Sequence, residues 1–143
     1  MKEILKYDGC FVCGDHNNIG LKARFFYKDN LAVTEILADE RFEGYKGIYH
    51  GGIISTILDE AMIKAILAEG KFAVTAEITV RFHVPIKIGD KLRIIGRVTE
   101  NKGKMFYTEA KALFNETEIV ASATGKCIEA RPDLRERLLQ SIS

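Results

Sequence analysis

The residues best suited to chemistry lie between positions 44 and 62. This stretch contains the run His50-Gly51-Gly52 at the point where a helical pattern begins. Paired glycines at a helix start cost backbone entropy, but they let a ligand come close to free N–H groups at the positive end of the helix dipole. Such a turn binds an anion, or a carbonyl oxygen that becomes one. In the alternative interpretation, Gly51 and Gly52 only permit a tight junction between loop and helix.

Two neighbouring acids, Asp59 and Glu60, lie further along the same stretch. Glu60 has Lys64 four residues later and Thr56 four residues earlier, so we expect it on the polar strip of the helix. Asp59 instead lies on a mostly apolar side, where desolvation makes a carboxylate more basic and suits it to act as a general base. In the alternative, Asp59 is structural and bonds to Ser55 or to the sheet.

The separation of the glycine turn and the acid has a consequence for assembly. Gly51 and Asp59 are eight residues apart, or about 12 Å along a helix at about 1.5 Å per residue. The two groups therefore cannot serve one reacting atom within one subunit. If two copies pack their helices antiparallel about a two-fold axis, Gly51 of one approaches Asp59 of the other. The spacing thus predicts a homodimer with two composite sites.

A long helix and several strands must position these residues. Residues 53–68 carry apolar side chains around most of the helical circumference, which is typical of a buried central helix. The expected strands are residues 21–27, 31–37, 72–84, 92–99, 105–114 and 119–128. Turns at 28–30, 101–104 and 115–117 predict a first hairpin and a final antiparallel meander. The order indicates an α+β domain in which one sheet curls around one helix, with the uncovered side of that helix meeting a second copy.

The composition predicts one domain over residues 1–143. The chain has 21 basic and 20 acidic residues, a net charge of +1, and 47% hydrophobic residues. The nearly balanced charge argues against a disordered chain and against a nucleic-acid binder. The apolar runs are short and the amino terminus lacks the pattern of a signal peptide, while three cysteines are an odd number. We therefore expect a cytoplasmic protein without a membrane partner, whose residues 1–20 form a loop segment and residues 132–141 a short helix.

The motifs and their order resemble those of a known family. The His50-Gly51-Gly52 turn, with an acid nine residues after the histidine, is similar to the turn of the hotdog-fold acyl-CoA thioesterases, nearest the phenylacetate-degradation type. The opening Cys10-Phe11-Val12-Cys13-Gly14 also resembles the start of many small members. The resemblance implies a hotdog fold, an antiparallel β-sheet wrapped around one long central α-helix, and a homodimer, either alone or paired into a homotetramer as a dimer of dimers.

The resemblance also implies roles for the turn and the acid. Gly51 would donate its N–H to the thioester carbonyl, with Gly52 and Gly47 contributing to substrate binding. Asp59 of the partner subunit would activate water as a general base, with a nucleophilic role as the alternative. His50 would shape the turn and touch the thioester, or only cap the helix. The products would be a free acid and coenzyme A, with no metal or organic cofactor required.

Further residues follow from the same resemblance. Thr75 falls where some relatives use Ser or Thr to position water. Three cations are candidates for the phosphates of coenzyme A, although each is also an ordinary surface charge: Arg81, Lys87 and Lys91. Several relatives carry an Asn six residues before the histidine, where this chain has Gly44, and the adjacent Glu43 is the candidate replacement.

Two other functions stay open. An acyl-thioester hydratase or dehydratase shares the fold, and His50 with Asp59 of a partner would imitate its catalytic pair. A non-catalytic acyl-CoA binder is favoured by the missing Asn. The acyl group itself is not fixed by the sequence, because its pocket depends on packing.

The remaining candidates have structural interpretations. Cys10 and Cys13 have zinc or redox spacing, with His16 close by, but a structural zinc site needs four ligands and Cys127 lies in a strand. We therefore expect no metal. Tyr45 and Tyr49 flank the glycine turn and line an acyl pocket or cover the helix end.

Overall fold

The computed structural model describes residues 1–142; residue 143, which the predicted domain includes, lies outside this range. The elements are β1 (Lys2–Glu3), β2 (Phe26–Lys28), β3 (Leu31–Leu37), the 3-10 helix η1 (Glu40–Phe42), α1 (Gly51–Ala68), β4 (Ala73–Phe82), β5 (Lys91–Lys102), β6 (Met105–Phe114), β7 (Glu118–Glu129) and α2 (Pro132–Ser141).

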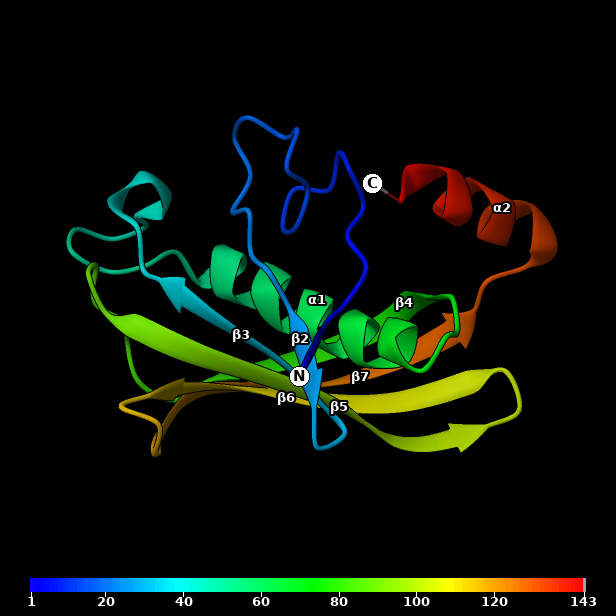
Figure 1. The fold of residues 1–143 in the computed structure, drawn as a ribbon. Helices are drawn as coiled ribbons and strands as arrows, with labels where there is room; N and C mark the ends of the chain where they lie inside the picture. The colour runs from blue at the N-terminus through cyan, green and yellow to red at the C-terminus, as the bar shows by residue number, and fades with distance from the viewer. Residues whose placement is uncertain (143) are drawn as a thin grey trace.

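One curved antiparallel sheet carries α1 across its concave face (Figure 1). The strand order is β1-β2-β3-β5-β6-β7-β4, so β5, β6 and β7 form the predicted meander. β4 follows α1 in the chain but pairs with β7, at the edge of the sheet. This is the hotdog arrangement that the family resemblance implies, and the predicted fold is confirmed.

The central helix packs closely on the sheet at two glycines. A Cβ at Gly96 of β5 would lie 2.4 Å from the carbonyl oxygen of Ala61. A Cβ at Gly125 of β7 would lie 3.1 Å from the sulfur of Met62. Ala61 and Met62 are fully buried, as predicted for a helix that is apolar around most of its circumference.

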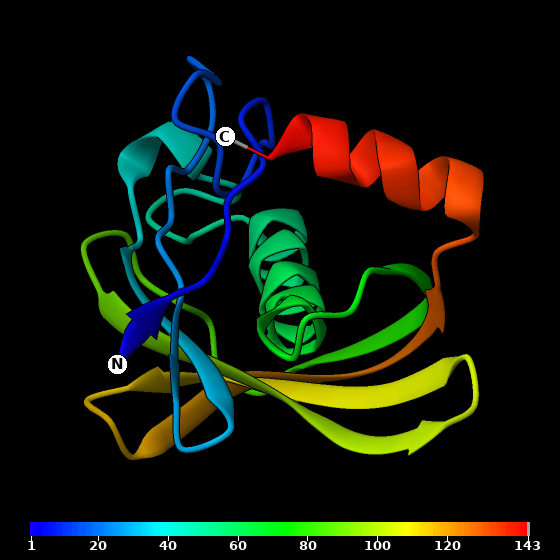
Figure 2. The same ribbon diagram turned by 45° about the vertical axis from the view of Figure 1, so that its right-hand side comes forward.

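The side of α1 that faces away from the sheet is covered in part by the chain itself. The N-terminal segment, residues 4–20, and α2 both lie on this side of α1, next to each other (Figure 2). Lys64 donates a hydrogen bond to the carbonyl of Leu5, and Cys10 bonds to Glu60. The expectation that this side is reserved for a second copy is therefore wrong for the part that residues 4–20 cover.

The first hairpin is shorter than predicted. Residues 21–25 bond to the N-terminal segment instead of continuing the strand; for example, Leu21 N donates to Phe11 O and Ala23 N to Val12 O. The turn has two residues, Asp29 and Asn30, both with positive φ, which suits the twist of a tight hairpin. No helix among the described residues has the length and apolar character needed to cross a membrane.

Candidate active site

The predicted glycine turn opens onto a groove of about 810 Å³ at the N-terminus of α1. His50 is the N-cap of this helix, and its Nδ1 accepts a hydrogen bond from Gly52 N at 2.9 Å. Gly51 is the first residue of α1, so its N–H has no carbonyl within the helix to bond to, and it has no other partner among the described residues. The groove is lined by Glu43, Gly44, Tyr45, Ile48, Tyr49, His50, Gly51, Gly52, Ile54, Phe82, His83, Val84, Pro85 and Ile86.

Side-chain contacts explain why both positions of the turn are glycine. A Cβ at Gly52 would lie 3.0 Å from Nδ1 and Cε1 of His50, and a Cβ at Gly51 would lie 3.3 Å from the ring of Phe82. Phe82 of β4 is 58% exposed and lies over the turn. Its alternating strand pattern gave no sign of this contact with the helix N-terminus.

The loop before the turn is held by Glu43. Its Oε2 accepts a hydrogen bond from Gly47 N at 2.7 Å, and Gly47 has a φ of +77°, which favours glycine. Gly44 lies against His50, since a Cβ there would be 3.2 Å from the Cα of that histidine. One carboxylate oxygen of Glu43 is therefore engaged in holding the loop, and Gly47 allows the loop to turn beside the predicted site.

Asp59 and Thr75 are brought together by the fold. Thr75 Oγ1 on β4 donates a hydrogen bond to Asp59 Oδ1 at 2.6 Å, and both side chains are half-buried. Ser55 bonds instead to the carbonyl of Gly51. A carboxylate held by a hydroxyl at the sheet edge has a fixed orientation and keeps its second oxygen for another donor.

Glu60 does not lie on a solvated strip. Its side chain is 14% exposed and that of Lys64 is 1% exposed, with 3.8 Å between Lys64 Nζ and Glu60 Oε2. Burial raises the pKa of Glu60 to about 7. The prediction was wrong because residues 4–20 cover this side of α1, and helical spacing alone does not reveal such a cover.

The three predicted cations are spread over the molecule. Arg81 pairs in register with Ser122 and shares the outer face of the sheet with it, away from α1. Lys91 begins β5 opposite Leu37. Lys87 forms a bridge with Ile48 and so lies beside the glycine loop. Within one chain, only Lys87 of these three adjoins the groove.

The two tyrosines and His83 have different surroundings. Tyr45 is 86% exposed at the groove, whereas Tyr49 is buried under it. His83 Nε2 shares a hydrogen bond with Ser122 Oγ at 2.8 Å, on the outer face of the sheet.

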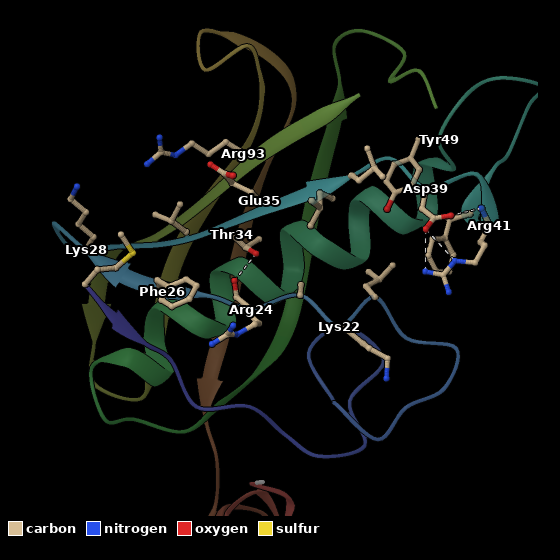
Figure 3. Close-up of a pocket in the computed structure, with 17 residues that line it drawn as sticks. Lys22, Arg24, Phe26, Lys28, Thr34, Glu35, Asp39, Arg41, Tyr49 and Arg93 are labelled. Atoms are coloured by element: carbon tan, nitrogen blue, oxygen red, sulfur yellow. Dashed lines mark hydrogen bonds and ion pairs between the residues drawn. The ribbon is translucent and has the colours of Figure 1, made fainter. Parts of the chain in front are cut away.

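A second cavity of about 520 Å³ lies beside β2 and β3 (Figure 3). Arg24, Arg41 and Arg93 line it, but each is paired with an acid: Glu3, Asp39 and Glu116 respectively. The charges are therefore compensated, and the cavity contains neither Asp59 nor the glycine turn.

The chain is similar to a curated protein over part of its length. An uncharacterized protein of Schizosaccharomyces pombe is 30% identical over 92 residues, which are 60% of this chain and 53% of the relative. The chain thus spans about half the length of this curated relative.

Three solved structures have a similar fold. A thioesterase superfamily protein has a TM-score of 0.81 at 20% identity, covering 85% of this chain and 61% of that one. The PaaI protein from the phenylacetic acid degradation operon of E. coli has a TM-score of 0.72 at 20% identity, covering 78% and 81%. A hypothetical thioesterase from Streptococcus pneumoniae TIGR4, solved with coenzyme A, has a TM-score of 0.70 at 20% identity, covering 73% and 85%.

The family model of the thioesterase superfamily matches residues 46–121, which hold the glycine turn, α1 and β4 to β6. This match covers just over half of the chain and confirms the resemblance drawn from the sequence motifs. The chain belongs to the thioesterase superfamily.

Proposed function

We propose that this protein hydrolyses acyl-CoA thioesters to a free acid and coenzyme A. The observation that carries the proposal is the 2.6 Å hydrogen bond between Thr75 and Asp59 on the helix whose N-terminus presents the free Gly51 N–H. This helix therefore offers an oriented carboxylate and an oxyanion donor. The S. pneumoniae relative solved with coenzyme A supports a ligand of this class.

The proposed reaction uses these groups in one addition and one elimination. The carboxylate of Asp59 accepts a proton from water as the water oxygen bonds to the thioester carbon. Gly51 N–H stabilises the negative oxygen that forms. The carbon–sulfur bond then breaks, and the thiolate of coenzyme A takes up a proton. No metal or organic cofactor has a role in these steps.

The two groups lie too far apart to act within one chain, so we propose that the site is shared between two copies. Thr75 of β4 lies beside Asp59, and Phe82, at the other end of the same strand, lies beside Gly51. Antiparallel pairing of two β4 strands about a point between Ile78 and Thr79 would set Phe82 of one copy opposite Thr75 of the other. The sheet edge at β4 supports this pairing, because β4 has a strand on one side only and Phe82 is exposed.

His50 fits the hydrolase better than the hydratase. Its Nδ1 accepts the Gly52 N–H, so the proton of the neutral ring lies on Nε2. In this form His50 is a donor toward a carbonyl and not a base that removes a proton from carbon.

The S. pneumoniae relative offers a parallel for the acid and its partner. That protein was also solved with an aspartate replaced by alanine and with a threonine replaced by alanine. The two replaced positions are separated by 16 residues, as Asp59 and Thr75 are. The equal spacing supports a functional role for this pair in both chains.

The test is thiol release from short, medium, long and phenylacetyl acyl-CoAs. Wild type and Asp59→Asn are compared, with Asp133→Asn on exposed α2 as the control. We expect turnover by the wild type and the control, and a loss of at least about 100-fold in Asp59→Asn with unchanged assembly. The panel also reports which acyl chains fit. Lys87→Ala tests recognition of the coenzyme A phosphates, since loss of that contact should raise KM.

Two outcomes would overturn the proposal. Binding of acyl-CoA without thiol release would indicate a binding protein, and release of water from a 3-hydroxyacyl-CoA would indicate a dehydratase. Undiminished turnover in Asp59→Asn would exclude Asp59 as the base.

A further inference from the structure

A second cluster of reactive side chains lies on the other side of α1 and has no part in the proposed hydrolysis. It consists of Cys10 and Cys13 from the N-terminal segment and Glu60 from α1. The two sulfurs and a carboxylate oxygen all lie within 4.8 Å of one another. Cys13 is buried, while Cys10 and Glu60 are partly buried.

The backbone around the cysteines forms a turn that orients both sulfurs. Gly14 N donates to Cys10 O at 2.8 Å, and Val12 N donates to Cys10 Sγ at 3.3 Å. A Cβ at Gly14 would lie 2.4 Å from Asp8 O, so this close turn requires glycine. N–H groups that point at sulfur stabilise the thiolate, which is the form of cysteine that binds metals.

The spacing of the ligand atoms fits a tetrahedral ion. Zinc binds sulfur at about 2.3 Å and carboxylate oxygen at about 2.1 Å, so two such ligands at a tetrahedral angle are about 3.6 Å apart. Cys10 Sγ and Glu60 Oε2 are 3.7 Å apart. The cluster therefore needs little movement to hold an ion of this size.

The charges of the cluster also fit a divalent cation. Lys64 is buried beside Glu60, and its Nζ is held by the carbonyl of Leu5 and by the ring of Tyr7. Two thiolates and one carboxylate with one ammonium leave two negative charges. A divalent cation neutralises these charges, which removes the main cost of burying them.

The ionisation of the cysteines agrees with this geometry. The hydrogen bond with Cys13 lowers the pKa of Cys10 to about 5, with help from the backbone N–H groups of Cys13 and Val12 and from the charge of Lys64. The same hydrogen bond and burial raise the pKa of Cys13.

We propose that Cys10, Cys13 and Glu60 bind one zinc-type divalent cation, with water as the fourth ligand. The sequence places His16 close to the two cysteines, but His16 is exposed and bonded to Asp8. Cys127 lies on β7, as expected, in a separate buried cluster with Ile66 of α1. The third protein ligand comes instead from α1. Such an ion would join the N-terminal segment to the central helix.

The test is a cobalt titration of the full chain after reduction and chelation. We expect one Co²⁺ per chain, with the absorption band of thiolate-to-cobalt charge transfer, and displacement of this band by Zn²⁺. Cys13→Ser should abolish the band, and Glu60→Gln should weaken binding at least tenfold. Cys127→Ser is the matched control, because it removes a buried thiol outside the cluster and should keep the band.

Three outcomes would overturn the proposal. The first is that the chain binds neither Co²⁺ nor Zn²⁺ although all three cysteines titrate as free thiols. The second is that Cys127→Ser loses the cobalt band as fully as Cys13→Ser does. The third is that the protein isolated anaerobically contains a Cys10–Cys13 disulfide and no metal. Circular dichroism of each variant checks its fold, and Glu60→Gln keeps the test valid if Cys13→Ser does not fold. The spectroscopic readout is independent of thioester hydrolysis, so either proposal can fail alone.

Discussion

Asp59 and Glu60 are neighbours on one helix, yet their surroundings differ. Asp59 faces β4, where one hydroxyl holds it at the open edge of the sheet. Glu60 faces the N-terminal segment, where burial keeps its pKa at about 7 beside two cysteines and Lys64. The element that covers each side of a helix therefore decides what the acids on that side can do. On this basis we propose a base for water on one side of α1 and a ligand for an ion on the other.

The largest expected effect separates these two acids. Asp59→Asn should lower kcat at least about 100-fold, because the amide cannot take a proton from water. Glu60→Gln should retain at least about 30 times the turnover of Asp59→Asn while losing cobalt affinity. Steady-state thiol release and cobalt titration on both variants measure this contrast. Equal losses of turnover would mean that the two sides of α1 act as one site.

The sequence predicted the surroundings of Asp59 better than those of Glu60, for physical reasons. Apolar periodicity predicts the buried helix and the alternating strands, and the glycine turn with an acid nine residues after His50 indicates the family. The helical spacing of Glu60 from Thr56 and Lys64 predicted a solvated strip. Residues 4–20 have no periodic pattern from which their packing on that side of α1 could be predicted. The contacts of Phe82 with the turn and of Cys10 with Glu60 join distant parts of the chain, which local patterns do not encode.

The second largest effect tests the packing on the sheet side of α1. Gly96→Ala should destabilise the fold by about 2 to 3 kcal/mol, because its Cβ would meet a backbone oxygen that cannot move without shifting the helix. Gly9→Ala, in the N-terminal segment, has no atom within 4 Å of the added Cβ and is the matched control. Urea denaturation measures both. If Gly96→Ala lowered the free energy of unfolding no more than Gly9→Ala does, the contact between α1 and the sheet at Gly96 would be less tight than the structure indicates.

Thr75 should have an intermediate effect on catalysis, since it acts by positioning Asp59. Thr75→Val removes the donor of the 2.6 Å hydrogen bond and should lower kcat about tenfold, the value of one hydrogen bond to a charged group. KM should change less than about twofold. Thr75→Ser restores a hydroxyl and should recover most of kcat. Loss in the serine variant as large as in the valine variant would indicate packing and not hydrogen bonding.

A smaller effect distinguishes the two roles of His50. His50→Ala removes the acceptor for Gly52 N–H and should cost about 1 kcal/mol of stability. His50→Asn can cap the helix and should recover that stability in thermal denaturation. If His50→Asn also recovered full thiol release, the imidazole ring would have no contact with the thioester.

The smallest expected change is in the alkylation of Cys10 in reduced, metal-free protein. Because its pKa is lowered from 9.0 to about 5, its thiolate persists as the pH falls from about 8 to about 6, whereas an ordinary thiol loses about 100-fold of its thiolate over that range. The rate with iodoacetamide should therefore change less than about twofold in the folded chain and about 100-fold in urea. Glu60 ionises near pH 7 at 3.7 Å from the sulfur, so Glu60→Gln should flatten any remaining slope. Peptide mapping assigns the modified residue, with Cys10→Ser as the control. A tenfold or greater decline in the folded chain would show that the Cys13 hydrogen bond, the backbone N–H groups and Lys64 do not hold a thiolate, and that the covered side of α1 carries ordinary thiols.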